Sequence, residues 1–89
     1  ASATTRLCGR HAVQVTPSDR AAAAVDLDAV AARLDAHGEV RRTRFMVRVD
    51  LVDAGRPLRL TVFPDGRTIV HGTDEANVAR AVCARYLGM

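Results

Sequence analysis

Apolar and polar residues alternate along several short stretches of this chain, as in strands with one buried face. The alternation predicts strands over residues 11–15, 45–51, 58–63 and 67–71, the first ended by Thr16 and Pro17. In the second strand the predicted buried face consists of Phe45, Val47, Val49 and Leu51, and in the third of Leu58, Leu60 and Val62. A loop over residues 53–57 joins these two strands into an expected antiparallel hairpin.

Two other stretches have the 3.6-residue period of an amphipathic helix. The first covers residues 27–34, with Asp26 as N-cap and Gly38 closing it. The second follows residues 72–75, whose Thr and acidic side chains suit a helix N-terminus, and Gly88 closes it. Its apolar stripe consists of Val78, Ala79, Val82, Cys83 and Tyr86. The order strand-helix-strand-strand-strand-helix predicts an α+β two-layer sandwich, with both helices on one face of an antiparallel sheet.

The stretch VFPDGRTIVHGTDE, residues 62–75, could be a ligand-binding loop or a hairpin. Pro64 fixes φ, Asp65 can accept a local backbone N–H, and Gly66 takes positive φ without a Cβ clash. A phosphate-binding loop would place several glycines before a helix N-terminus, whereas this one leads into a predicted strand. We therefore expect a hairpin beside which Arg67 projects.

Length and composition narrow the possible functions. The 89 residues suffice for one small domain, and the 3% aromatic content predicts an aliphatic core. All 13 basic residues are Arg, which excludes Schiff-base chemistry and a P-loop lysine. The net charge of +3 is diluted by ten interspersed carboxylates. No apolar run approaches the ~20 residues of a membrane span, and the start lacks a signal-peptide pattern, so we expect a cytoplasmic protein without membrane contact.

The cysteines and histidines form no recognisable metal or catalytic motif. The three histidines fall in separate predicted elements, and neither C-x-x-C nor H-x-x-x-H spacing occurs, so no metal site is expected. Cys83 lies on the apolar stripe of a helix and is expected in the core. Cys8 precedes Gly9 and Arg10 and is a candidate thiol, either packed or activated by the neighbouring cation.

The sheet face opposite the helices is a candidate interaction surface. Its expected exposed residues are Met46, Arg48, Asp50, Arg59 and Thr61. Met and Arg are enriched in protein interfaces, and the edge strands of a short sheet can pair with another chain. Arg10 and Gln14 could either hydrogen-bond within the domain or contact a partner.

A double-stranded-RNA-binding module is an alternative, because helix, three strands and helix, with RRTR at residues 41–44, match its layout. Asp74 and Glu75, however, precede the second helix, where such a domain needs cations for phosphate. Few aromatics are available for base stacking. A nucleic-acid partner is therefore not the expected one.

Three stretches, TTRLCGRHAVQV, LTVFPDGRTIVHGTDE and ARAVCARYLG, resemble the C-terminal extension of bacterial ThiF/MoeB/HesA adenylyltransferases, over about residues 4–88. The resemblance implies a part in the ATP-dependent activation of a ubiquitin-like sulfur carrier for thiamin, molybdopterin or related sulfur transfer. That family uses ATP, Mg and often structural Zn. The chain lacks the family's Gly-rich nucleotide fingerprint and paired C-x-x-C motifs. The resemblance therefore implies a non-catalytic accessory domain without a cofactor of its own.

The positions that match the family are Cys8, Gly9, Arg10, Val13, Gln14, Phe63, Pro64, Asp65, Gly66, Arg67, Gly72 and Thr73. We expect turn-forming roles for Gly9, Pro64, Gly66 and Gly72. The candidate interaction residues are Arg10, Gln14, Asp65, Arg67, Met46, Arg48 and Arg59. Expected partners are the adenylyltransferase catalytic domain, a ubiquitin-like sulfur carrier or a second copy. A thiol- or sulfur-transfer module using Cys8 is a further alternative.

Overall fold

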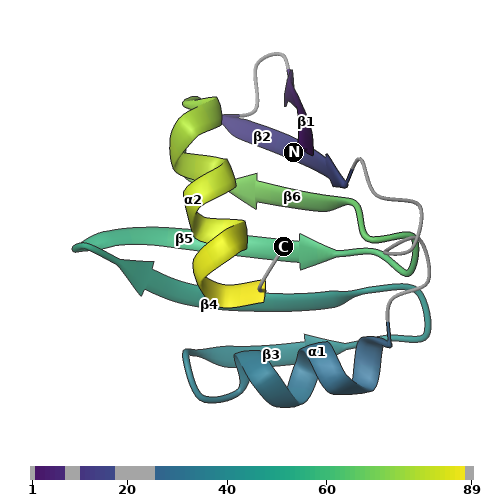
Figure 1. Ribbon diagram of the computed structural model, residues 1–89. Coiled ribbons are helices and arrows are strands. Elements are labelled where there is room, and N and C mark those ends of the chain that lie inside the picture. Colours follow the sequence, from purple (N-terminus) through teal and green to yellow (C-terminus); the bar gives the residue numbers. More distant parts are fainter. Residues whose placement is uncertain (1, 8–10, 18–25, 88–89) are drawn as a thin grey trace.

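A computed structural model describes residues 2–7, 11–17 and 26–87, and for residues 2–7 the backbone alone. The described residues form six strands and two helices (Figure 1). In chain order they are β1 (Ser2–Leu7), β2 (Ala12–Pro17), α1 (Leu27–Leu34), β3 (Glu39–Arg42), β4 (Val47–Asp53), β5 (Arg56–Val62), β6 (Thr68–His71) and α2 (Ala76–Leu87).

The six strands form one antiparallel sheet in the order β1-β2-β6-β5-β4-β3. Strands β3 to β6 are a meander, because each pairs with the next along the chain. Strand β2 pairs with β6, so the N-terminal hairpin extends the sheet beside the last strand. Short connections favour the meander, whereas the pairing of β2 with β6 brings together segments distant in sequence.

Both helices pack on the same face of the sheet, as Figure 1 shows, and the predicted α+β class is confirmed. The alternating residues of the central strands point at the helices and are buried: Val13, Val15, Val47, Val49, Leu51, Leu58, Leu60 and Val70. Leu27 and Leu34 of α1 and Ala79, Val82 and Cys83 of α2 complete this core. The described core is aliphatic, as the composition predicted. Neither described helix is long and apolar enough to cross a membrane.

Side chains at the start of each helix bind the free backbone N–H groups. The Asp26 carboxylate accepts from the N–H groups of Asp28 at 3.0 Å and Ala29 at 3.4 Å, which confirms the predicted N-cap. Before α2, the Thr73 hydroxyl accepts from the Glu75 N–H at 3.1 Å. The first helix ends at Leu34, with Asp35 as its C-cap, and thus earlier than the predicted stop at Gly38.

The two outer strands of the sheet, β1 and β3, were not predicted. Strand β3 has one apolar residue, Val40, in four, so its sequence carries little alternation. Its backbone hydrogen bonds to β4 hold it in the sheet. Strand β2 also continues through Thr16 and Pro17, which were expected to end it, because β1 pairs with it as far as Pro17.

Two predicted side-chain positions were wrong. Phe45 was expected in the core but is 70% exposed, because β4 begins two residues later, at Val47. Thr61 was expected at the surface but is buried, since its neighbours across the strands on that face are the longer Arg48 and Ile69. In β6, Val70 is buried in the core and Ile69 points to the other face.

Candidate interaction surface

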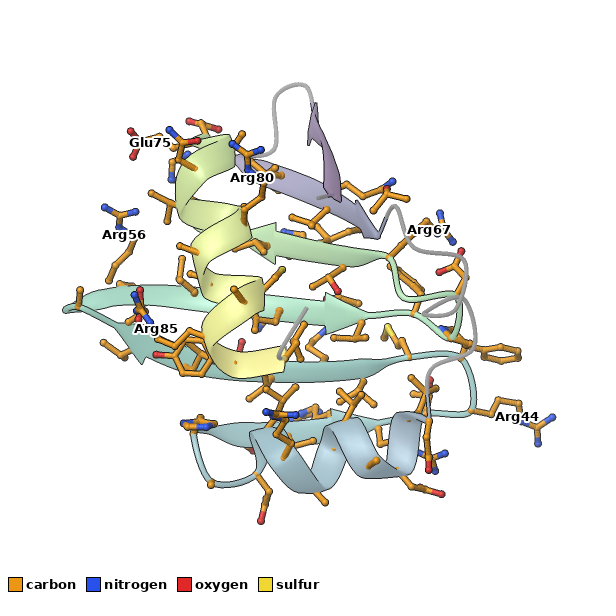
Figure 2. The ribbon with its side chains drawn as sticks, viewed as in Figure 1. Arg44, Arg56, Arg67, Glu75, Arg80 and Arg85 are labelled. Carbon is orange, nitrogen blue, oxygen red and sulfur yellow. The ribbon has the colours of Figure 1, made fainter. Side chains whose placement is uncertain are left out.

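The predicted hairpin at residues 63–67 is a closed turn. The Gly66 N–H donates to the Phe63 carbonyl at 2.9 Å, and the Phe63 N–H donates to the Arg67 carbonyl at 2.9 Å. Asp65 accepts from the Arg67 backbone at 3.1 Å and from its guanidinium at 2.6 Å. The guanidinium also lies 5.1 Å from the centre of the Phe63 ring. Asp65 and Arg67 therefore pair with each other in the turn between the central strands β5 and β6, where Figure 2 labels Arg67.

Two of the glycines predicted to form turns, Gly66 and Gly72, have positive φ. Pro64 lies in the turn, and Gly66 has φ of 90°. Gly72 has φ of 109°, and a Cβ there would lie 2.7 Å from the Pro57 carbonyl oxygen. The Gly72 N–H donates to the His11 carbonyl at 3.0 Å, so this glycine also connects β6 to the start of β2.

The predicted thiol residue Cys8, with Gly9 and Arg10, lies outside the described residues. Cys83 is buried in the core, as predicted, and burial raises the pKa of its thiol to about 12. Gln14 is partly buried on β2, and its side-chain amide donates to the Thr16 hydroxyl at 3.4 Å. Within the described part of the chain, no three His, Cys, Asp or Glu residues are grouped as metal ligands.

The sheet face that points away from both helices is called here the open face. Strand pairing arranges its side chains in two parallel cross-strand rows. The first row contains Arg41, Arg48, Thr61, Ile69 and Gln14. The second contains Glu39, Asp50, Arg59 and His71. Three predicted interaction residues thus come together on this face, namely Gln14, Arg48 and Arg59, whereas Asp65 and Arg67 belong to the hairpin.

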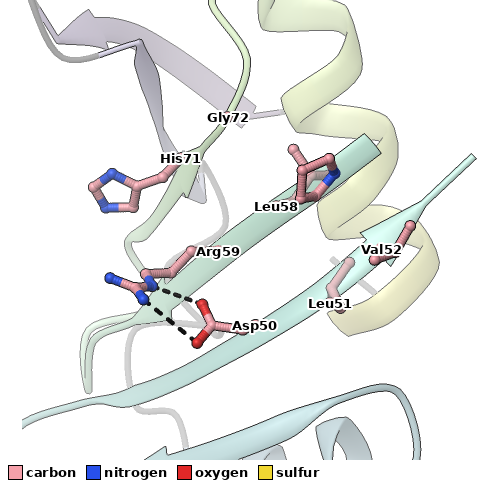
Figure 3. A pocket seen from close by; sticks show the side chains of 8 residues that line it. Asp50, Leu51, Val52, Leu58, Arg59, His71 and Gly72 are labelled. Carbon is pink, nitrogen blue, oxygen red and sulfur yellow. Dashed lines mark hydrogen bonds and ion pairs between the residues drawn. The ribbon is translucent and has the colours of Figure 1, made fainter. Parts of the chain in front are cut away.

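The second row carries a tight ion pair. The Arg59 guanidinium donates to both Asp50 oxygens, at 2.7 and 3.4 Å (Figure 3). The hydrogen bond from Arg59, followed by the positive charges of Arg59, Arg48 and Arg41, lowers the pKa of the Asp50 carboxyl. The pair borders a shallow hollow of about 530 Å³, which His71 and Val52 also line. Because its charges neutralise each other, this part of the open face has little net charge.

The first row is cationic. Arg41 and Arg48 lie directly opposite each other on β3 and β4, an arrangement in which like charges repel. The Nε atom of Arg48 and the hydroxyl of Thr61 are buried and have no hydrogen-bond partner. Such atoms cost free energy when they stay unpaired. The ion pairs between described residues all lie elsewhere on the surface. None of them places a carboxylate in this row.

Sequence reasoning missed the turn that joins β3 to β4, because it assigned Phe45 to a buried strand. The Thr43 hydroxyl accepts from the backbone N–H groups of Phe45 at 3.1 Å and Met46 at 3.2 Å. The Thr43 N–H in turn donates to the Met46 carbonyl at 2.9 Å. A Thr followed by a polar residue is a turn signal that could have identified this site. Met46 is partly buried, while Arg44 and Phe45 are exposed.

Comparison with known proteins gives one significant match. Over 83 residues, the chain is 31% identical to the sulfur carrier protein ThiS adenylyltransferase of Bacillus subtilis (strain 168). The match covers 92% of this chain and 23% of that protein, so the chain spans less than a quarter of the relative's length. No family model matches the chain, and no solved structure matches it.

Proposed function

We propose that this chain is a non-catalytic accessory domain of a ThiF/MoeB-type adenylyltransferase and that it works in the cytoplasm by contacting proteins. The observation that carries the proposal is the match along 92% of the chain to an enzyme named for the sulfur carrier ThiS. The nucleotide, Mg and Zn sites of such an enzyme would lie in other parts of the protein. The partners would be the catalytic domain and the ubiquitin-like carrier, and a second copy is a further candidate.

The open face supports a role in protein contact. It combines the cationic row with the charge-neutral hollow, a mixture of Arg and apolar surface of the kind found in interfaces. Arg48 and Arg59 are therefore the predicted interaction residues that we place at the contact, with Gln14 on the same face. Asp65 and Arg67 bind each other and form a second, separate candidate contact.

The proposal is tested by calorimetric titration of the chain with the sulfur carrier proteins of its own genome, and with the matching adenylyltransferase core. We expect saturable binding without ATP–pyrophosphate exchange by the chain alone. A double variant, Asp50→Asn with Arg59→Gln, removes the open-face ion pair without changing net charge and should weaken binding. The matched control, Asp65→Asn with Arg67→Gln, removes the hairpin pair in the same way.

Each outcome of the titration has a distinct meaning. Loss of binding in the control variant alone would show that the contact lies at the hairpin and not on the open face. No binding of the unmodified chain to either partner would overturn the proposed function. Of the two alternatives, RNA binding is opposed by Asp74 and Glu75 before α2, and the Cys8 thiol lies outside the described residues.

A further inference from the structure

An aromatic side chain projects from the turn between β3 and β4. Phe45 is 70% exposed, and with Val52 it is one of two exposed large hydrophobic residues in the described chain. Leaving a hydrophobic side chain of this size in water costs free energy relative to burying it. Single exposed apolar residues are common, so the surroundings of Phe45 decide whether it has a role.

Hydrogen bonds within the turn hold the backbone at Phe45 in place. Three hydrogen bonds of 2.9–3.2 Å link Thr43 to the backbone of Phe45 and Met46. The Arg44 guanidinium lies 6.0 Å from the centre of the Phe45 ring, within the range of a cation–π contact. Figure 2 shows Arg44 at this turn, directed away from the sheet. A turn whose backbone is already ordered loses less conformational entropy when it binds a partner.

The turn is surrounded by positive charge that the described residues do not neutralise. Four arginines occur among residues 41–48. Arg42 pairs with Asp28 of α1 at 3.1 Å. In the described part of the chain, the charged pairs include no carboxylate bound to Arg41, Arg44 or Arg48. A protein surface that carries carboxylates would complement this charge.

The extent of this charge favours a protein over a nucleic acid. The adjacent row on the open face contains Glu39 and Asp50, so the cationic area is one row deep. A phosphate backbone needs a continuous cationic track, which these two acids interrupt. One exposed aromatic beside several arginines instead matches the anchor residues that dominate protein interfaces.

We propose that the β3–β4 turn is a docking site for an acidic partner protein. Phe45 enters an apolar pocket on that protein, whose carboxylates pair with Arg41, Arg44 and Arg48. This inference rests on the proposed function and deepens it, because it assigns the contact to one turn and gives the partner surface its chemistry. The sulfur carrier serves as the test partner.

The test titrates the chain and four variants with the sulfur carrier at low and high salt. Phe45→Ser should weaken binding by about tenfold or more, as expected for an interface anchor. Its control is Ala81→Ser, which alters an exposed apolar residue on α2, away from the open face, and should leave affinity unchanged. Arg44→Gln should weaken binding at low salt, whereas Arg80→Gln, an equal charge change on α2, should not.

The outcomes separate this inference from the proposed function. Thermal unfolding of each variant verifies the fold, which Phe45→Ser should preserve because the ring is exposed. If the carrier binds Phe45→Ser as tightly as the unmodified chain, the docking role of the β3–β4 turn is overturned and the proposed function stands. Absence of carrier binding by the unmodified chain overturns this inference, and the proposed function falls with it only if the adenylyltransferase core is not bound either. Phe45-dependent binding of single-stranded RNA, or Phe45-dependent self-association, in place of carrier binding overturns the assignment to an acidic partner protein.

Discussion

At the scale of single residues, positions with the same amino acid can differ widely in their tolerance of change. Gly55 and Gly72 both have positive φ, 78° and 109°. A Cβ at Gly55 would meet nothing within 4 Å, whereas one at Gly72 would lie 2.7 Å from the Pro57 carbonyl oxygen and 2.9 Å from the Leu58 side chain. The two glycines therefore share a conformational requirement and differ in the space around them.

Gly72→Ala should lower the free energy of unfolding by about 3 kcal/mol, because it adds a steric clash to backbone strain. Gly55→Ala carries strain alone and should cost about 1 kcal/mol. Urea denaturation of both variants gives the difference. Equal losses in the two variants would contradict the close approach of Gly72 to β5.

Cys83 gives a second prediction at this scale. Its thiol is 1% exposed, and burial raises its pKa to about 12, so the reactive thiolate is scarce at neutral pH. In a Cys8→Ser variant, we expect Cys83 to react with a thiol reagent at pH 8 only as fast as the domain unfolds, and at once in denaturant. Rapid reaction of the native variant would contradict the burial of Cys83.

At the scale of elements, local signals predicted the interior of the fold well and its margins poorly. The alternation in β4 and β5 and the helical period of α1 and α2 were correct, because each of these elements buries one face. Strand β3 (Glu39–Arg42) buries little and is held by pairing with β4, an interaction that its own four residues do not express. The same limit applied to Phe45: where β4 starts depends on the Thr43 turn, and so this exposed side chain was assigned to the core.

The N-cap of α1 provides a prediction for one element. Asp26 accepts from two backbone N–H groups at the start of an eight-residue helix, which is too short to be stable alone. Asp26→Ala should lower the free energy of unfolding by about 1 kcal/mol. Asp35→Ala, which removes the same charge at the helix C-terminus, should be neutral or slightly stabilising. Chemical denaturation tests both, and an equal loss in both would show that charge matters more than capping.

At the scale of the whole molecule, one polar cluster joins the layers at the end of β4. The Asp53 carboxylate accepts hydrogen bonds from Tyr86 at 2.9 Å and from Arg85, both on α2. The His37 ring, which follows α1, packs edge-on against Tyr86 with ring centres 4.9 Å apart. These residues are far apart in sequence, and no local pattern connects them. Sequence analysis placed Tyr86 on the apolar stripe and gave Asp53 to a loop, so it could not foresee this cluster.

This cluster predicts how stability depends on pH. The hydrogen bond from Tyr86, followed by that from Arg85, lowers the pKa of Asp53. A carboxyl with a lowered folded-state pKa stabilises the protein above its unfolded value of about 3.9, and this contribution is lost as pH falls through the folded value. Asp53→Asn should therefore cost about 1.5 kcal/mol near pH 7, and the difference from the unmodified chain should shrink steadily below about pH 4.

The measurement is the free energy of unfolding of both proteins from pH 2 to pH 7. Asp50→Asn is the matched control: its pKa is lowered too, but its ion pair with Arg59 is about half exposed, so solvent screens it and its pH-dependent loss should be smaller. The Asp53 side chain is 15% exposed, which preserves more of its interaction with α2. A stability difference for Asp53→Asn that does not change with pH would mean that the carboxylate charge does not hold α2 to the sheet.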